Sequence, residues 1–190
     1  MKRHLPLIVA AALLFIVDRP AFAHDTNDVP RTRLEAFEAT TGRVIIKGTE
    51  ELGSITTKNG HLTVKLHEYR DVPSNQRQFG IAVLVRQNEL TEDTTTVDED
   101  ELEAFIAGID YVSKADPSIS SLNHFEAYYA SRAGLRVASY SSRRTSGVEA
   151  SVTSSRYLRS KTWLNMSQLA QFKNLVEQAQ TKIEAIRKTR

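Results

Sequence analysis

The chain has 190 residues, no cysteine and a formal net charge of +2. Without cysteine it can form neither a disulfide nor a thioether-linked lipid anchor, so the fold depends on a hydrophobic core alone. A domain of this length buries roughly 70 % of the surface of its unfolded chain, which is enough for one core and indicates a single domain.

Residues 1–23 contain the three parts of a cleavable secretory signal peptide, in the expected order. Lys2 and Arg3 make a positive start, the apolar run LPLIVAAALLFIV follows, and the segment ends in an A-x-A site at Ala23. The apolar run is shorter than the roughly 20 residues that span a bilayer. We therefore expect cleavage between Ala23 and His24, a periplasmic or secreted product, and a flexible tail over residues 24–32.

Charge is divided unevenly along the expected mature chain. Removal of residues 1–23 leaves 22 basic and 22 acidic side chains, so the net charge is zero. Residues 24–117 hold 10 Lys or Arg and 18 Asp or Glu, whereas residues 118–190 hold 12 and 4. Three interpretations stay open: the halves complement each other within one molecule, molecules associate head to tail, or the basic half binds an external anion.

In the first half, alternation of apolar and polar residues predicts several strands and then a helix. Strands are expected at residues 33–40, 43–48, 55–57, 62–67, 79–85 and 94–97. Thr41-Gly42 and Asn59-Gly60 predict hairpin turns. Asp98 and Glu101 have the spacing of a capping box, which predicts a helix from residue 98 to residue 115 that Pro117 ends.

The second half repeats this pattern of strands and helix. Strands are expected at residues 123–131, 134–141, 147–153 and 160–164. A helix is expected over residues 166–188, with Asn165 and Gln168 as its capping box. We therefore predict an α+β domain over residues 33–190.

The two halves can be aligned, which predicts two tandem repeats, at about residues 33–117 and 118–190. The helices match at a constant offset of 67, and this offset pairs Phe105 with Phe172. The first strands match at an offset of 91, which pairs Glu35-Ala36-Phe37 with Glu126-Ala127-Tyr128. We expect each repeat to be an antiparallel sheet followed by a helix, and Phe105 and Phe172 to be buried.

Two segments carry a resemblance to an uncharacterised family of exported bacterial proteins. They are LEAFEATTGRVIIKG at 34–48 and HFEAYYASRAGLRVASYSSRRTSGVEASVTSSR at 124–156. This resemblance implies export and brings no site residues with it. The doubled order of strands then helix is also similar to that of the Whirly and Pur-type proteins, which implies a single-stranded nucleic-acid partner.

No motif in the sequence specifies a metal, a cofactor or a reaction. If cleavage precedes His24, its amine and imidazole together are a weak candidate copper site, but no other histidine lies at a metal-ligand spacing. No nucleophile elbow of the G-x-S-x-G type is present. We expect no cofactor, and an exported hydrolase with a site assembled from strand ends stays open as an alternative.

The basic half contains the candidate binding residues, because arginines alternate there with aromatic residues. Arginine pairs with phosphate or sulfate, and aromatic rings stack on flat ligand groups. The candidate site residues are Arg132, Arg136, Arg143, Arg144, Arg156, Arg159 and Tyr140, with Lys161, Tyr128 and Trp163 nearby.

This pattern predicts an exported, non-catalytic module that binds an anionic polymer or a component of the cell envelope. A single-stranded nucleic-acid binder is a further alternative. Two plainer explanations also stay open, namely a solvated sheet edge and charge complementarity with the acidic half. The oligomeric state is not specified by the sequence.

Overall fold

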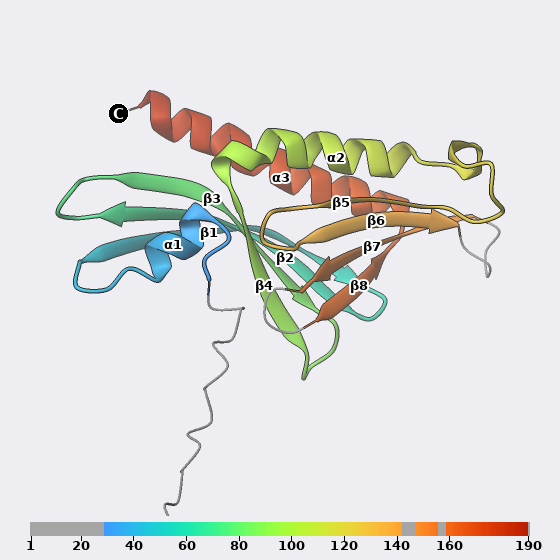
Figure 1. The fold of residues 1–190 in the computed structure, drawn as a ribbon, viewed down its shortest axis with the longest axis horizontal. Coiled ribbons are helices and arrows are strands. Elements are labelled where there is room, and N and C mark those ends of the chain that lie inside the picture. Colours follow the sequence, from blue (N-terminus) through green and yellow to red (C-terminus); the bar gives the residue numbers. More distant parts are fainter. Residues whose placement is uncertain (1–28, 142–146, 156–158, 190) are drawn as a thin grey trace, which may run out of the picture.

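The computed structural model describes residues 29–141, 147–155 and 159–189, which form an α+β fold with two antiparallel sheets (Figure 1). Sheet A has four strands in sequence order: β1 (Ile45–Thr57), β2 (Gly60–Asp71), β3 (Arg77–Arg86) and β4 (Glu92–Asp98). Sheet B has four more: β5 (Glu126–Ala130), β6 (Arg136–Ser141), β7 (Val148–Ser154) and β8 (Ser160–Leu164). The helices are α1 (Arg33–Glu38), α2 (Leu102–Lys114) and α3 (Met166–Lys188), with short 3-10 turns at Glu99–Glu101 and Pro117–Ile119.

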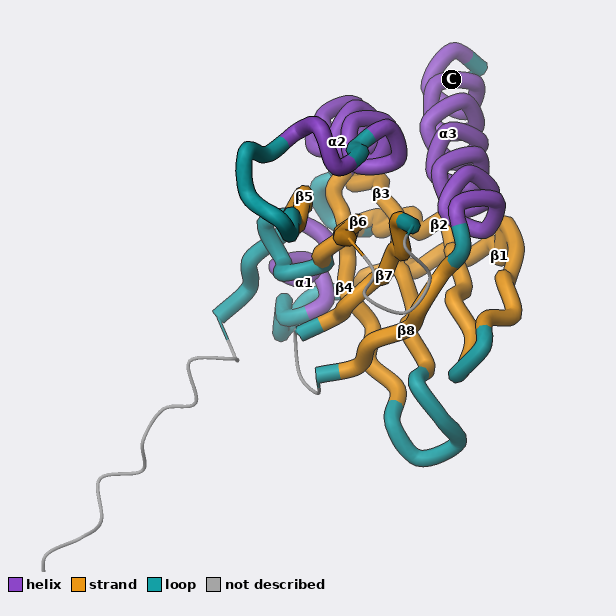
Figure 2. The backbone as a smooth tube through the Cα atoms, turned by 90° about the vertical axis from the view of Figure 1, so that its right-hand side faces the viewer, coloured by secondary structure: helices purple, strands orange, loops and turns teal. Residues whose placement is uncertain are grey.

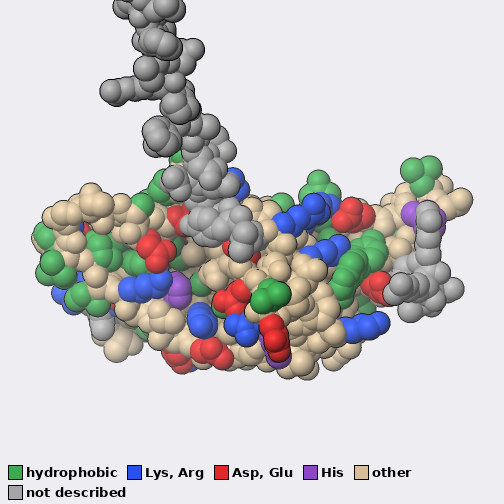
Figure 3. All heavy atoms as spheres, turned by 90° about the horizontal axis from the view of Figure 1, so that it is seen from below, with side chains coloured by type: hydrophobic (Ala, Val, Ile, Leu, Met, Phe, Trp, Pro, Cys, Tyr) green, Lys and Arg blue, Asp and Glu red, His purple; other side chains and the backbone are tan. Residues whose placement is uncertain are grey.

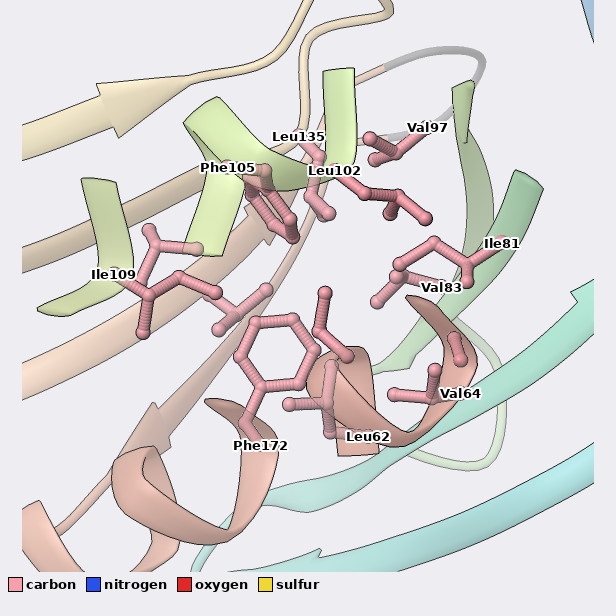
Figure 4. Packing of buried hydrophobic residues seen from close by; sticks show 14 of the residues in the cluster. Leu62, Val64, Ile81, Val83, Val97, Leu102, Phe105, Ile109, Leu135 and Phe172 are labelled. Atoms are coloured by element: carbon pink, nitrogen blue, oxygen red, sulfur yellow. The ribbon is translucent and has the colours of Figure 1, made fainter. Parts of the chain in front are cut away.

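The helices α2 and α3 lie side by side on one side of the two sheets (Figure 2). Both sheets and both long helices contribute to one hydrophobic core (Figure 4). Its fully buried side chains include Leu62, Val64, Ile81, Val83, Phe105, Leu135, Val137 and Phe172. Phe105 and Phe172 meet edge to face, with ring centroids 6.1 Å apart. The α+β class and the burial of these two rings are therefore confirmed.

Hydroxyl groups close the seam where the two sheets meet. Thr95 on β4 shares a hydrogen bond with Ser154 on β7, and the Ser154 hydroxyl donates to Asp93 Oδ2 at 2.7 Å. Thr57 and Thr162 share a second bond across the seam. Because each of these four hydroxyls has a hydrogen-bond partner, they join the sheets without leaving their own donors unpaired.

The strand expected at residues 33–40 is wrong, because this segment is helix α1. Thr32 Oγ1 accepts from Glu35 N at 3.1 Å, and the Asp98 carboxylate accepts from Arg33 N at 2.8 Å and Leu34 N at 3.1 Å. These bonds satisfy three of the free N–H groups of the first helical turn. The Thr41-Gly42 hairpin is therefore also wrong, and Thr32 belongs to a helix cap and not to a flexible tail.

The same carboxylate explains a second difference. Asp98 makes no side-chain cap for the 3-10 turn that precedes α2, since it caps α1 instead, so the first predicted capping box is wrong. The second is confirmed: Asn165 Oδ1 accepts from Gln168 N at 2.8 Å, and Asn165 N donates to Gln168 Oε1 at 2.9 Å. The hairpin near Asn59 is confirmed as well, with Thr57 and Gly60 as the closing pair.

The sequence matches between the two halves hold in part. At the offset of 67, Leu102, Phe105 and Ile109 pair with Leu169, Phe172 and Val176, and all six are fully buried. The match at the offset of 91 is wrong, because Glu35–Phe37 lie in helix α1 whereas Glu126–Tyr128 lie in strand β5. The strands expected separately at residues 43–48 and 55–57 are joined, because residues 49–54 between them continue β1 as one long strand.

Candidate functional site

The outer face of sheet B, which is the face turned away from the core, carries three aromatic rings and two cations. Side chains alternate between the faces of a strand, so the register defines this face. One row across the sheet consists of Tyr128, Ala138, Ser151 and Trp163. Tyr140, Arg136 and Lys161 lie on the same face in the flanking rows.

On the β5–β6 side of this face, the Arg136 side chain stacks on the Tyr128 ring. The Arg136 guanidinium carbon lies 3.8 Å from the centroid of the Tyr128 ring, and its Nη2 lies 3.0 Å from Glu126 Oε1. A cation over an aromatic ring is attracted by the ring's quadrupole. Tyr128 nevertheless stays 58 % exposed, so much of its surface is open to a ligand.

A second group on this face is the cluster of Lys161, Trp163 and Tyr140. Lys161 Nζ lies 4.0 Å from the Trp163 ring centroid and 5.6 Å from that of Tyr140. The Trp163 and Tyr140 rings meet edge to face at 5.3 Å. Trp163 is 39 % exposed, so this cluster also presents a ring to solvent.

Partial burial on this face changes the proton affinity of two groups. Burial, and then the nearby Glu149 and Glu126, raise the pKa of Tyr140 above its usual range. Burial lowers the pKa of Lys161, because the charged ammonium loses hydration. The Tyr140 hydroxyl and Arg136 Nε are buried and make no hydrogen bond within the part of the chain that the structure describes.

Two small residues lie beneath these larger side chains on the outer face. Ala138 and Ser151, in the middle of the aromatic row, are each only 2 % exposed although they point away from the core. The larger side chains around them therefore cover them. Figure 3 views the molecule from the side opposite α2 and α3, and Lys and Arg side chains lie there beside a hydrophobic patch in the part that sheet B occupies.

The predicted site residues divide into three groups. Arg136 and Tyr140 belong to the outer face of sheet B, and Arg159 is exposed just before β8. Arg132 lies elsewhere, in the turn after β5 and close to Asp98 at the end of β4. Three of the predicted residues, Arg143, Arg144 and Arg156, lie outside the described residues, as does His24.

Arg132 forms ion pairs with three carboxylates of the first half. It bonds to Asp100, its Nε lies 3.2 Å from Glu101 Oε2, and its Nη2 lies 3.7 Å from Asp98 Oδ2. The bond to Asp100, with further help from Glu101, raises the pKa of Arg132. An external anion would have to compete with three carboxylates, so we leave Arg132 out of the site.

Other cations of the basic half also pair with the acidic half. Arg187 bonds to both carboxylate oxygens of Glu99, Lys182 bonds to Glu50, and Lys173 Nζ lies 3.0 Å from Asp110 Oδ1. The structure thus supports charge complementarity within the molecule for this part of the basic half, and leaves sheet B as the candidate site.

The sequence indicated the residue types of this face but not which of its residues come together. Tyr129, which is next to Tyr128, points the other way, and its ring lies 5.7 Å from that of Phe105 in the core. Strict alternation along β5 is the signal that separates the two tyrosines.

The described ranges contain neither a metal-binding cluster nor a membrane-spanning helix. Among residues 29–141, 147–155 and 159–189, no group of three or more His, Asp or Glu side chains could hold a metal ion. In the same ranges, no helix is long and apolar enough to cross a membrane. In comparisons with known proteins, the chain matches no family model and no curated sequence.

Proposed function

We propose that the protein is an exported, non-catalytic module that binds an anionic polymer across the outer face of sheet B. The observation that carries this proposal is the pairing of exposed rings with cations: Arg136 with Tyr128, and Lys161 with Trp163. The pattern of residues 1–23 supports export. The anionic polymer would then be a component of the cell envelope or of the surrounding medium.

The physical argument rests on two complementary contacts. A guanidinium or ammonium group pairs with phosphate or sulfate, and long-range attraction speeds the encounter. The exposed parts of Tyr128 and Trp163 offer flat surfaces on which rings of the polymer stack. A groove is not required, because polymers bind along surfaces through several weak contacts that add up.

Single-stranded nucleic acid is the second candidate polymer. Unpaired bases have two π-faces each, and stacking on an aromatic side chain contributes about 1–3 kcal/mol per base. Three aromatic side chains on one sheet face favour this ligand over a polymer of saturated rings. The order of four strands and a helix, repeated once, is also the order on which the likeness to Whirly and Pur-type proteins rests.

We further propose that the halves are copies of one unit, consisting of four antiparallel strands and one helix. The order β1–β4 then α2, and β5–β8 then α3, supports this proposal. So does the equal burial of the paired residues of α2 and α3. The proposed unit begins at β1, so α1 belongs to the first half only.

Retention on a heparin column and binding of a labelled single-stranded oligonucleotide, both at about 50 mM salt, test the function. We expect wild-type binding, and a loss of about 1–3 kcal/mol for Tyr128→Ala or Trp163→Ala where the ligand stacks. Arg136→Ala should weaken both ligands. Tyr111→Ala is the control, because Tyr111 is 63 % exposed on α2, away from the site.

The two ligands distinguish the candidate polymers. Binding of both, with loss of oligonucleotide binding in the aromatic variants, supports the nucleic-acid candidate. Retention on heparin without oligonucleotide binding supports a sulfated or otherwise acidic glycan. If the wild-type protein binds neither at this salt concentration, the proposed function is wrong.

A further inference from the structure

We infer that the bound polymer runs across the strands of sheet B, leaves the sheet over its edge strand β8, and is held beyond that edge by Lys58 of the β1–β2 turn. This inference rests on the proposed function and adds a binding residue from the acidic half of the chain. It follows from how the turn is attached to β8 and from where unpaired cations lie.

Asn59 attaches the β1–β2 turn to the open edge of β8. Its Nδ2 donates to Lys161 O at 3.1 Å, and its Oδ1 accepts from Trp163 N at 3.0 Å. The Thr162 hydroxyl donates to the same oxygen at 3.2 Å. The turn therefore lies where a further strand would pair with β8, directly beside Lys161 and Trp163.

A second contact joins the same edge to sheet A. Lys161 N donates to Gln87 Oε1 at 3.3 Å, and Gln87 directly follows β3. The backbone of β8 is thus bonded to two separate loops of the first half. A ligand that passes over Trp163 and beyond the edge of β8 therefore next reaches these loops of the first half, which are bonded directly to β8.

Cations without a carboxylate partner gather at this edge. Lys161 and Trp163 alternate with inward-facing residues of β8, so both lie on the outer face, and Arg159 is exposed just before this strand. Lys58, next to Asn59, is exposed. Within the described residues none of these three cations forms an ion pair, in contrast to Arg132, Lys173, Lys182 and Arg187.

Among the described residues, the other two borders of the face carry carboxylates, which disfavour an anion. The opposite edge strand, β5, has Glu126 as its one charged residue. The end of the face near the β6–β7 connection carries Glu149, which lies beside Tyr140 in the register. A polyanion that stacks on Trp163 therefore has its favourable exit over β8, where Arg159, Lys161 and Lys58 are.

The test is the salt dependence of binding by the full-length mature protein. The probes are a labelled oligothymidylate of about 12 nucleotides and a labelled heparin fragment. A lysine that contacts a phosphate lowers affinity for all sequences when removed and reduces the salt slope by about 1. We expect this for Lys58→Ala, and recovery of the slope in Lys58→Arg.

Lys188→Ala is the matched control, because Lys188 is also exposed and lies at the end of α3. It should bind as the wild type does. If Trp163→Ala weakens binding while Lys58→Ala keeps the wild-type affinity and slope, this path is wrong although the proposed function stands. If the wild-type protein binds neither probe, the proposed function fails and this inference fails with it.

Discussion

His67 on β2 is a buried histidine without a hydrogen-bond partner for its Nδ1 among the described residues. It is 7 % exposed, and its ring lies 6.0 Å from that of Tyr69. Burial, and then the charge of Lys47, lower the pKa of His67 to about 4. The folded protein therefore holds this side chain neutral at a pH where the unfolded chain would be half protonated.

The first prediction at this scale is that acid weakens the fold through His67. A histidine with a lowered pKa contributes stability above its unfolded pKa of 6.5, and this contribution is lost as the pH falls toward 4. Between pH 7.5 and pH 5 the loss should be about 2 kcal/mol. Urea unfolding of wild type and His67→Gln at the two pH values measures it.

The variant should show a smaller loss over this range, because it has no group to protonate at that position. His61→Gln is the control, since His61 lies on the same strand and is exposed. An equal pH dependence in wild type and His67→Gln would contradict the assignment.

At the scale of elements, the two long helices could be predicted from the sequence because their signals are local. Helix α3 has its bounds at the predicted residues, since Asn165 and Gln168 cap each other within one turn. Helix α1 was predicted as a strand although Thr32 and Glu35 have the T-x-x-E spacing of a helix start. Its decisive partner, Asp98, is 65 residues away from Arg33, and no local pattern reveals such a contact.

The candidate site shows the same limit. The sequence indicated a half of the chain rich in arginine and aromatic residues, and Arg136 and Tyr140 do lie on one face. It could not show that Arg132 is occupied by Asp100 and Glu101, because these residues come together only through tertiary packing. Local patterns predict which way a side chain points, whereas its partner depends on the whole fold.

The prediction at this scale concerns the contact between α2 and α3. Phe105→Ala or Phe172→Ala should each lower the free energy of unfolding by about 3–5 kcal/mol, because each leaves a cavity in a close-packed core. The double variant should show a coupling of about 0.5–1.5 kcal/mol, since the two rings meet edge to face. Denaturant unfolding of the four proteins measures both quantities.

A double variant whose loss equals the sum of the single losses would show that the rings do not interact. Tyr111→Ala is the control for the loss of an aromatic side chain from α2, because Tyr111 is 63 % exposed. Its effect on stability should be within about 0.5 kcal/mol.

At the scale of the molecule, opposite charges of the two halves meet within one chain. Arg187 and Glu99, Lys182 and Glu50, and Lys173 and Asp110 join α3 to the first half. Exposed pairs of this kind contribute about 0–1 kcal/mol each. Their main effect is therefore to neutralise, within the molecule, charges that would otherwise attract other molecules.

The prediction is that salt leaves the state of association unchanged. Sedimentation velocity at about 50 mM and about 500 mM sodium chloride should give one species of the same size, because the paired charges are already matched internally. Only a modest fall in unfolding free energy should accompany the added salt. Oligomers that form at low salt and dissociate at high salt would instead support head-to-tail association.

The capping of α1 by Asp98 has a consequence for the order of events during folding. A helix of six residues is too short to persist alone in water. Its cap comes from the end of β4, and Leu34 packs against Gly80, where a Cβ atom would lie 2.6 Å from Leu34 Cδ1. We therefore expect this segment, although synthesised early, to become stable as a helix only once β3 and β4 have paired.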